Sequence, residues 1–237
     1  MPPLAVDPYR SIRRGPAVPS AGSQHLQETA SRPITFTSEG LTLEGVLHPP
    51  ASAPFPAAAV CHPHPLYGGD MNNSVVVAVC QALAEAGIAS LRFNYRGVGR
   101  SEGTYGDGLG ERADAAAALA YLRRLADVEQ DKVGIVGYSF GATVALTAAD
   151  ERVAAAAAIS IPSFGQDVPS LALRCPTLLI SGEQDEIAPA ASLATLARTI
   201  GPQCQMSVVP GADHFWWGHE EELAERVAQF FRRCLIG

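Results

Sequence analysis

The segment that most constrains the fold is an apolar run followed at once by a G-x-S-x-G pentapeptide and an alanine-rich stretch. The apolar run covers 132–136, the pentapeptide is Gly137–Gly141 with Ser139 at its centre, and the alanine-rich stretch is 142–149. The run predicts a buried strand and the alanines predict a helix. So tight a turn between strand and helix strains its central residue and exposes that side chain at the end of the sheet. The order therefore predicts a serine hydroxyl at a helix N-terminus, an arrangement called a nucleophile elbow.

The rest of the chain alternates between strand and helix signals after an initial hairpin. Alternating apolar residues at 34–37 and 41–47, joined by a turn at 38–40, predict that β-hairpin. Further strands are expected at 57–61, 88–95, 132–137, 153–161, 177–181 and 205–209, with helices at 72–86, 111–126, 142–149, 188–200 and 220–235. This alternation predicts the α/β class, a mostly parallel twisted sheet with helices on both faces.

Length and composition fit one domain preceded by a leader of different character. The chain has 237 residues, of which 47% are hydrophobic and 17% charged, enough for a single buried sheet over 33–237. Residues 1–32 are rich in proline and arginine without apolar periodicity, which predicts a disordered or loosely packed leader. No apolar stretch follows Arg13-Arg14, as a twin-arginine export signal would require, so we expect a cytoplasmic protein.

Charge and motif content exclude several classes of partner. A net charge of −7 argues against a nucleic-acid partner, and no apolar run reaches the length that spans a membrane. The five cysteines have neither C-x-x-C nor zinc spacing, so we expect reduced thiols and no metal. Gly97-Val98-Gly99 is not a dinucleotide fingerprint, because Gly103 stands one place too far and no helix opens there. We therefore expect no cofactor, and the sequence carries no signal of oligomeric state.

Three side chains that share one chemistry follow the ends of three predicted strands. Ser139 follows 132–137, Asp185 follows 177–181, and His214 follows 205–209. Ligands bind at the carboxyl ends of parallel strands, so these loops are expected to meet there. A serine hydroxyl needs an imidazole to take its proton, and the imidazole needs a carboxylate to fix its tautomer. The sequence predicts a catalytic triad of Ser139, Asp185 and His214.

Alternatives exist for the serine and for the acid. Ser139 precedes a predicted helix, so its alternative role is that of an N-cap that only stabilises the helix. Glu183 and Glu186 compete with Asp185, and all three are candidates for plain solvated loop charges. Asp185 is preferred because it lies a few residues past the strand, with Pro189 starting a helix after it.

The general base also has competitors. His219 lies in the first turn of the closing helix and reads as a surface residue. His62 and His64 come too early in the chain for the order serine, acid, histidine. His214 is therefore the predicted base.

From about residue 34 onward the chain resembles the α/β-hydrolase superfamily. The segment 61–73, C-H-P-H-P-L-Y-G-G-D-M-N-N, is similar to the signature H-P-H-P-L-x-G-G-x-M-x-N of small, cap-less bacterial serine hydrolases related to the dienelactone-hydrolase branch. The segment 92–103 is similar to that family's strand-4 signature. Dienelactone hydrolases themselves use a cysteine nucleophile, so the serine at 139 means that their lactone substrate is not carried over.

The resemblance also implies an oxyanion hole made of two backbone N–H groups. One is that of Phe140, directly after the serine, and the other maps onto His64. Pro65 has no N–H, and Leu66 is the reserve choice. Two such donors stabilise the charge that develops on the substrate oxygen in the transition state.

The pocket is expected to be shallow and made of loops. Only 162–176 separates two predicted strands at the point where many superfamily members insert a helical cap. Aromatic side chains near this edge are candidates for lining the substrate pocket or for plain packing: Tyr67, Phe164, Phe215, Trp216 and Trp217.

These observations predict a serine hydrolase acting on a small-molecule ester or thioester through an acyl-enzyme. An amidase or peptidase with the same triad is one alternative, because nothing in the motifs separates amides from esters. A catalytically silent domain that serves as a binding module is the other.

Overall fold

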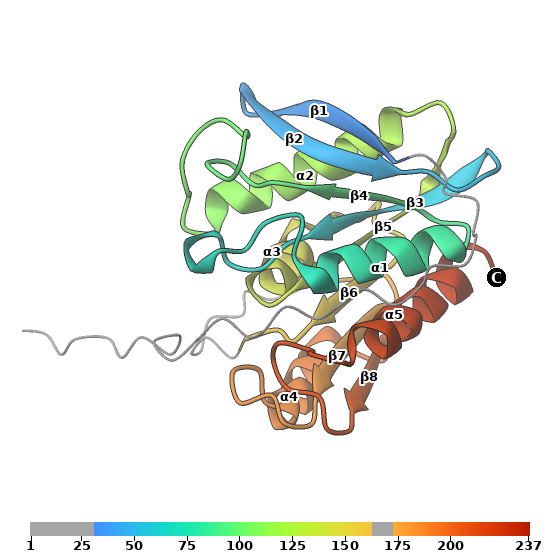
Figure 1. Ribbon diagram of the computed structural model, residues 1–237. Coiled ribbons are helices and arrows are strands. Elements are labelled where there is room, and N and C mark those ends of the chain that lie inside the picture. Colours follow the sequence, from blue (N-terminus) through green and yellow to red (C-terminus); the bar gives the residue numbers. More distant parts are fainter. Residues whose placement is uncertain (1–30, 163–172) are drawn as a thin grey trace, which may run out of the picture.

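The computed structural model describes residues 31–162 and 173–237, which form one sheet flanked by helices (Figure 1). The strands are β1 Arg32–Ser38, β2 Leu41–His48, β3 Phe55–Cys61, β4 Ala89–Phe93, β5 Val128–Tyr138, β6 Ala156–Ile159, β7 Thr177–Gly182 and β8 Cys204–Val209. The helices are η1 Pro65–Tyr67, a short 3-10 turn, and α1 Ser74–Glu85, α2 Leu109–Arg124, α3 Phe140–Ala148, α4 Ala190–Ile200 and α5 Glu220–Leu235. The predicted leader lies almost entirely outside the described residues, and so does Phe164.

The sheet order within the described residues is β1-β2-β4-β3-β5-β6-β7-β8. The first hairpin is antiparallel and joins β4 antiparallel, whereas β4, β3, β5, β6, β7 and β8 run parallel. The predicted α/β class with a mostly parallel sheet is thus confirmed. Parallel strands end at the same edge, so the loops that follow β3, β4, β5, β7 and β8 gather there.

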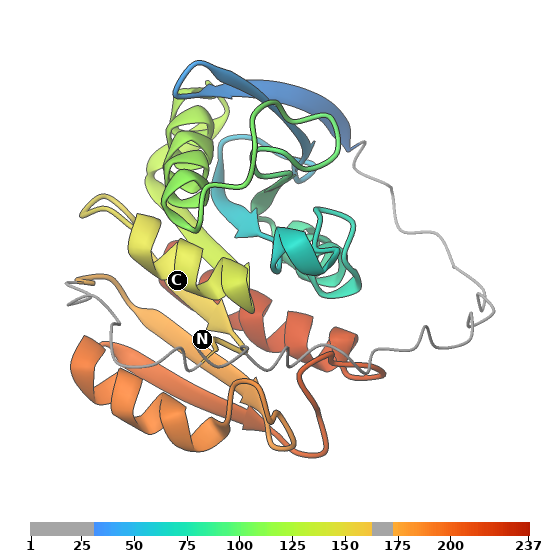
Figure 2. The same cartoon turned by 90° about the vertical axis from the view of Figure 1, so that its left-hand side faces the viewer.

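Helices cover both faces of the sheet because the central strands are apolar on both sides. In β3, Ala57, Ala59 and Cys61 pack into the cluster that holds α2, α3 and α4. Ala58 and Val60 point to the opposite cluster, where α1 and α5 lie side by side (Figure 2). This period of two is what a fully buried parallel strand requires.

Element boundaries differ from the sequence prediction in the middle of the sheet. The strand expected at 153–161 is only Ala156–Ile159, because Val153 closes a turn onto the Asp150 carbonyl and Ser160 takes a positive φ of 49°. The strand that leads to Ser139 begins earlier, at Val128, which pairs with Phe55. Within the described part of the chain, no helix has both the length and the hydrophobicity to cross a bilayer.

His62, the first residue after β3, is fully buried and ties the end of β3 to the residues after β4. Its Nε2 accepts a hydrogen bond from the Tyr95 N–H at 3.2 Å. Its Nδ1 lies 2.7 Å from the Pro63 carbonyl oxygen and therefore carries the proton. Burial lowers the pKa of His62 to about 4. The ring is thus held neutral.

We expect the free energy of unfolding to decrease as the pH falls from about 6.5 to about 4. In this window the unfolded chain binds a proton on His62 and the folded chain does not, so stability is lost as the pH falls. The difference between the ordinary pKa of 6.5 and about 4 corresponds to about 3 kcal/mol. His48, whose pKa burial also lowers to about 4, acts in the same direction. Urea unfolding at a series of pH values measures the slope.

The matched variants are His62→Gln and His219→Gln. His62→Gln is expected to be less stable at pH 7.5 but to have a flatter pH dependence, since one titrating group is gone. His219 is partly exposed at the start of α5, and its replacement controls for the loss of a histidine outside the buried site. An unchanged slope in His62→Gln contradicts the assignment.

Candidate active site

Ser139 lies between β5 and α3 in a backbone conformation that side chains rarely adopt. Its φ is 55° and its ψ is −122°. Such strain costs on the order of 1–3 kcal/mol and persists only where the surroundings enforce it. Here the Ser139 N–H donates to the Ile159 carbonyl of β6 at 2.8 Å. The strained turn projects the hydroxyl at the carboxyl edge of the sheet.

The two glycines of the pentapeptide permit contacts that no side chain allows. A Cβ at Gly137 would overlap the carbonyl of Gly141, one turn further on. A Cβ at Gly141 would overlap the carbonyls of Cys61 and His62 at the end of β3. The glycines therefore bring the start of α3 directly against the segment that follows β3.

Ser139, His214 and Asp185 form one hydrogen-bonded chain, and all three side chains are buried. The Ser139 Oγ lies 3.0 Å from His214 Nε2. His214 Nδ1 lies 3.0 Å and 2.9 Å from the two carboxylate oxygens of Asp185. Because a carboxylate only accepts, Nδ1 carries the proton, and Nε2 is left to accept from the serine hydroxyl.

Asp185 is held as a carboxylate by the loop after β7. Burial raises its pKa, but the hydrogen bonds from His214 and from the Ala188 N–H outweigh burial, and the net pKa is lowered. Its Oδ1 accepts from the N–H groups of Ile187 and Ala188 at 3.0 Å and 2.7 Å. These bonds hold the carboxylate beside His214 Nδ1.

The competing residues lie elsewhere. Glu183 and Glu186 are exposed, and Glu183 accepts from the Gly211 N–H. His219 lies 3.8 Å from Glu222 on α5. The structure thus brings Asp185 and His214, and none of these three alternatives, to the serine.

The two backbone groups assigned to an oxyanion hole lie on adjacent segments. Phe140 is the first residue of α3, so its N–H has no helical carbonyl one turn earlier to donate to. The rings of His64 and Phe140 are 4.6 Å apart. The His64 carbonyl accepts from the N–H groups of Tyr67 and Gly69, which curls the loop around it. The reserve donor Leu66 gives its N–H to His64 Nδ1 at 3.2 Å.

Tyr105 belongs to this site although no sequence pattern marked it. Its hydroxyl lies 3.2 Å from His64 Nε2, and the two rings are 5.2 Å apart. Because His64 Nδ1 accepts from Leu66, Nε2 carries the proton and donates to the Tyr105 oxygen. Burial lowers the pKa of His64, which favours this neutral form. A cavity of about 290 Å³ opens between Tyr105, the 65–70 loop and residues 96–99.

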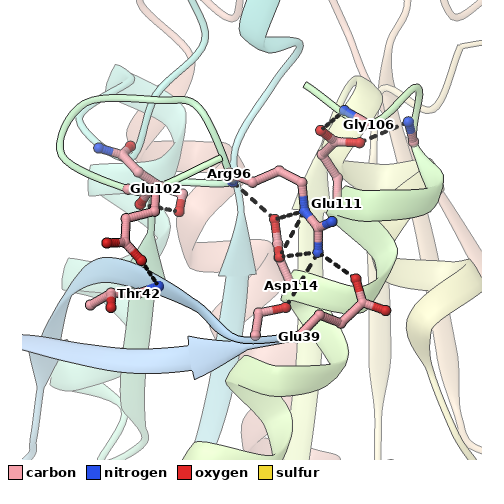
Figure 3. A network of polar contacts seen from close by, with 11 residues as sticks. Glu39, Thr42, Arg96, Glu102, Gly106, Glu111 and Asp114 are labelled. Atoms are coloured by element: carbon pink, nitrogen blue, oxygen red, sulfur yellow. Dashed lines mark hydrogen bonds and ion pairs between the residues drawn. The ribbon is translucent and has the colours of Figure 1, made fainter. Parts of the chain in front are cut away.

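The loop that carries Tyr105 is anchored by the polar network of Figure 3. Arg96 donates from Nε and Nη2 to the fully buried Asp114 of α2, and its Nη2 also reaches Glu39 in the first hairpin at 3.0 Å. Glu111 accepts from the N–H groups of Gly106 and Gly108, which flank Asp107 in the turn before α2. These charge-assisted bonds hold the glycine-rich loop against α2 and the first hairpin.

The aromatic residues proposed to line the pocket occupy different positions. Tyr67 is 51% exposed, with its ring 4.9 Å from that of His64. Phe215 is partly exposed, with its ring 5.7 Å from that of His214. Trp216 is fully buried and donates its indole N–H to Ser160 Oγ at 3.0 Å, so it does not line an open pocket as predicted. Its positive φ of 62° turns the side chain into the core.

Residues 31–162 and 173–237 contain no group of three or more His, Cys, Asp or Glu side chains arranged to hold a metal ion. A cavity of about 590 Å³ lies between α4 and β8 and includes none of Ser139, His214 or Asp185 in its walls. Ser139, Asp185 and His214 lie in the segments that follow β5, β7 and β8.

Two family models match the chain. One, described as X-Pro dipeptidyl-peptidase (S15 family), covers residues 7–170, and the other, described as PET hydrolase-like, covers residues 114–230. An uncharacterized protein of Rickettsia prowazekii is 34% identical over 208 residues, which are 83% of this chain and 87% of that protein.

Solved structures are similar to this chain over most of its length. An alpha-beta serine hydrolase homologue from Coxiella burnetii is 32% identical, with a TM-score of 0.75 over 87% of this chain and 99% of its own. A serine hydrolase without a lid from Xanthomonas campestris is 29% identical, with a TM-score of 0.78 over 90% of this chain and 99% of its own.

Proposed function

The chain belongs to the α/β-hydrolase superfamily, as a serine hydrolase that matches the S15 family model, and on that premise we propose that it cleaves small carboxylic esters or thioesters through an acyl-enzyme. The observation that carries the proposal is the hydrogen-bonded chain from Ser139 through His214 to Asp185 at the end of β5. Among the described residues, no other serine with a positive φ and glycines two positions to either side is hydrogen-bonded to a histidine that is itself bonded to a carboxylate.

In the acylation step, Ser139 Oγ attacks the carbonyl carbon while its proton passes to His214 Nε2. The carbonyl oxygen becomes an oxyanion that the N–H groups of Phe140 and His64 stabilise, each by about 3–4 kcal/mol. The N-terminus of α3 adds a favourable dipole. The tetrahedral intermediate then expels the alcohol or thiol, which takes the proton from His214, and the acyl group remains on Ser139.

In the second step, water takes the place of the alcohol or thiol. His214 removes a proton from the water as its oxygen attacks the acyl carbon, and then returns that proton to Ser139 Oγ. Asp185 stays ionised and stabilises the imidazolium that forms twice per cycle. The carboxylic acid leaves and the enzyme is restored.

A fluorophosphonate probe tests the proposal directly, because it reacts only with an activated serine. We expect one label per chain, located by peptide mass spectrometry on Ser139. The variant Ser52→Ala, at an exposed loop residue before β3, is expected to label like the wild type. A folded protein that takes up no label would favour the silent binding module instead.

Matched ester and anilide substrates with the same acyl group separate the second enzyme class. We expect the ester to be turned over far faster, because resonance stabilises the amide bond of the anilide and the amine is a poorer leaving group than the alcohol, while His214 supplies the proton to either one. Comparable rates on the two substrates would favour an amidase or peptidase.

Tyr105→Phe tests whether the His64 loop contributes to the oxyanion hole. The variant keeps the ring packing and removes the hydroxyl that accepts from His64, and one neutral hydrogen bond is worth about 1 kcal/mol. We expect kcat for short esters to fall about fivefold with little change in KM. Tyr121→Phe, on α2 against Phe36, is the matched control and should retain kcat. A change in KM alone would contradict a role in the transition state.

We also propose a cytoplasmic location, which the five free cysteines support. Burial raises the pKa of the Cys61 and Cys80 thiols to about 12 and about 11. Such thiols are unreactive and suit a reducing compartment without requiring it.

A further inference from the structure

The segment after His214 is fixed more firmly than an ordinary surface loop. Asp213 Oδ1 accepts from the N–H groups of Phe215 and Trp216 at 2.9 Å and 3.0 Å. Trp216 is buried, bonded to Ser160 and strained at a φ of 62°. The Tyr138 hydroxyl donates to the His214 carbonyl at 2.7 Å. Strain that so many contacts maintain is typical of segments that position a functional group.

What this loop positions is a pair of aromatic side chains on the surface. Because Trp216 turns inward, its neighbours Phe215 and Trp217 stack on each other, with ring centroids 5.1 Å apart and planes 20° from parallel. Trp217 is 61% exposed. The Phe215 ring stands edge-on to the His214 imidazole, at 5.7 Å and 89°. A stacked aromatic pair, with Phe215 partly exposed and Trp217 exposed, therefore begins next to the proposed general base.

The chemistry of the site decides which part of a substrate meets this pair. His214 Nε2 hands its proton to the oxygen or sulfur of the leaving group, so that atom must approach the imidazole. Whatever is attached to that atom continues past His214. In the proposed acylation step the acyl carbon is bonded to Ser139, and the carbonyl oxygen faces the N–H groups of Phe140 and His64. The pair therefore borders the leaving-group side, not the acyl side.

We propose that Phe215 and Trp217 form a leaving-group subsite that favours esters or thioesters of planar aromatic alcohols or thiols. The proposal rests on the proposed function and adds the substrate class to it. A flat ring entering beside His214 stacks on the exposed indole, an offset arrangement that aromatic pairs prefer. A saturated ring of the same size gains burial but not this geometry.

Two matched substrate pairs test the subsite. Benzyl acetate and cyclohexylmethyl acetate share an acyl group and differ only in the planarity of the leaving group's ring. Methyl phenylacetate and methyl cyclohexylacetate place the same difference on the acyl side. We expect kcat/KM of the wild type to be about fivefold higher for benzyl acetate than for its saturated partner.

The variants locate the effect. Trp217→Ala should bring the leaving-group ratio to about one while the acyl-side ratio stays as in the wild type, and Trp217→Phe should keep part of the preference. Leu109→Ala removes an apolar residue at the start of α2 that is more exposed than Trp217, and should keep both ratios and the activity. Urea unfolding of each variant verifies that the fold is intact.

Three outcomes overturn the subsite. The first is a wild-type leaving-group ratio near one, and the second is a preference that Trp217→Ala leaves intact. The third is a change confined to the acyl-side pair, which would place the acyl group on Trp217. Absence of any Ser139-dependent ester turnover would instead overturn the proposed function, and the subsite with it.

Discussion

The variant Ser139→Ala is expected to hydrolyse short-chain p-nitrophenyl esters with a kcat lower by about a millionfold. The substitution removes the hydroxyl oxygen that lies 3.0 Å from His214 Nε2. His214 and the backbone donors remain, so the residual rate should be that of water attacking a bound ester. KM should change little, because the hydroxyl contributes little to binding the ground state.

Two measurements keep this result interpretable. Urea unfolding should show a variant that remains folded, since alanine replaces the side chain without altering the Ser139 N–H bond to Ile159. The exposed-serine variant Ser52→Ala should keep wild-type kcat. A folded Ser139→Ala variant that retains a tenth of the activity or more would place the nucleophile elsewhere.

The variant Asp185→Asn is expected to lower kcat by about ten-thousandfold while leaving the fold intact. The N–H groups of Ile187 and Ala188 hold the Oδ1 side as an acceptor, so the new NH₂ group turns toward His214 Nδ1. Nδ1 must then accept, and the proton moves to Nε2, where it blocks transfer from Ser139. The variant thus tests the tautomer as well as the charge.

The matched control is Glu183→Gln. Glu183 lies two residues earlier, is exposed and is one of the two other candidates for the acid, so its variant should keep kcat within about twofold. Steady-state kinetics on the same ester compare the two. A large loss in Glu183→Gln together with a small loss in Asp185→Asn would reverse the assignment of the acid.

Much of the fold follows from local signals in the chain. Apolar runs of strand length bounded by glycine and proline predicted each parallel strand, and the structure differs mainly in where β5 begins and how short β6 is. Those boundaries depend on hydrogen bonds between strands, such as that between the Ser139 N–H and Ile159, which no single segment encodes. The type of each element can therefore be predicted from its own segment, whereas its first and last residues depend on contacts with neighbouring strands.

The position of the candidate site was also predictable, for a topological reason. Parallel strands all end at one edge, so a serine, an acid and a histidine just past three strand ends have to gather there. The sequence did not predict Tyr105 as a site residue, because its partner His64 is 41 residues away and its own loop has no periodicity. Nothing but the folded loops shows that the two rings meet.

Residue type alone fixed the strand–turn–helix around Ser139, since only glycine at 137 and 141 allows such close backbone approach. The chain by itself thus determined the α/β fold and the edge at which chemistry takes place. Only the tertiary structure decided that Trp216 is buried and that Trp217 is exposed. Adjacent tryptophans have the same intrinsic hydrophobicity. The positive φ of Trp216 is held by a local turn bonded to Asp213 and by the long-range hydrogen bond to Ser160, which the tertiary structure supplies.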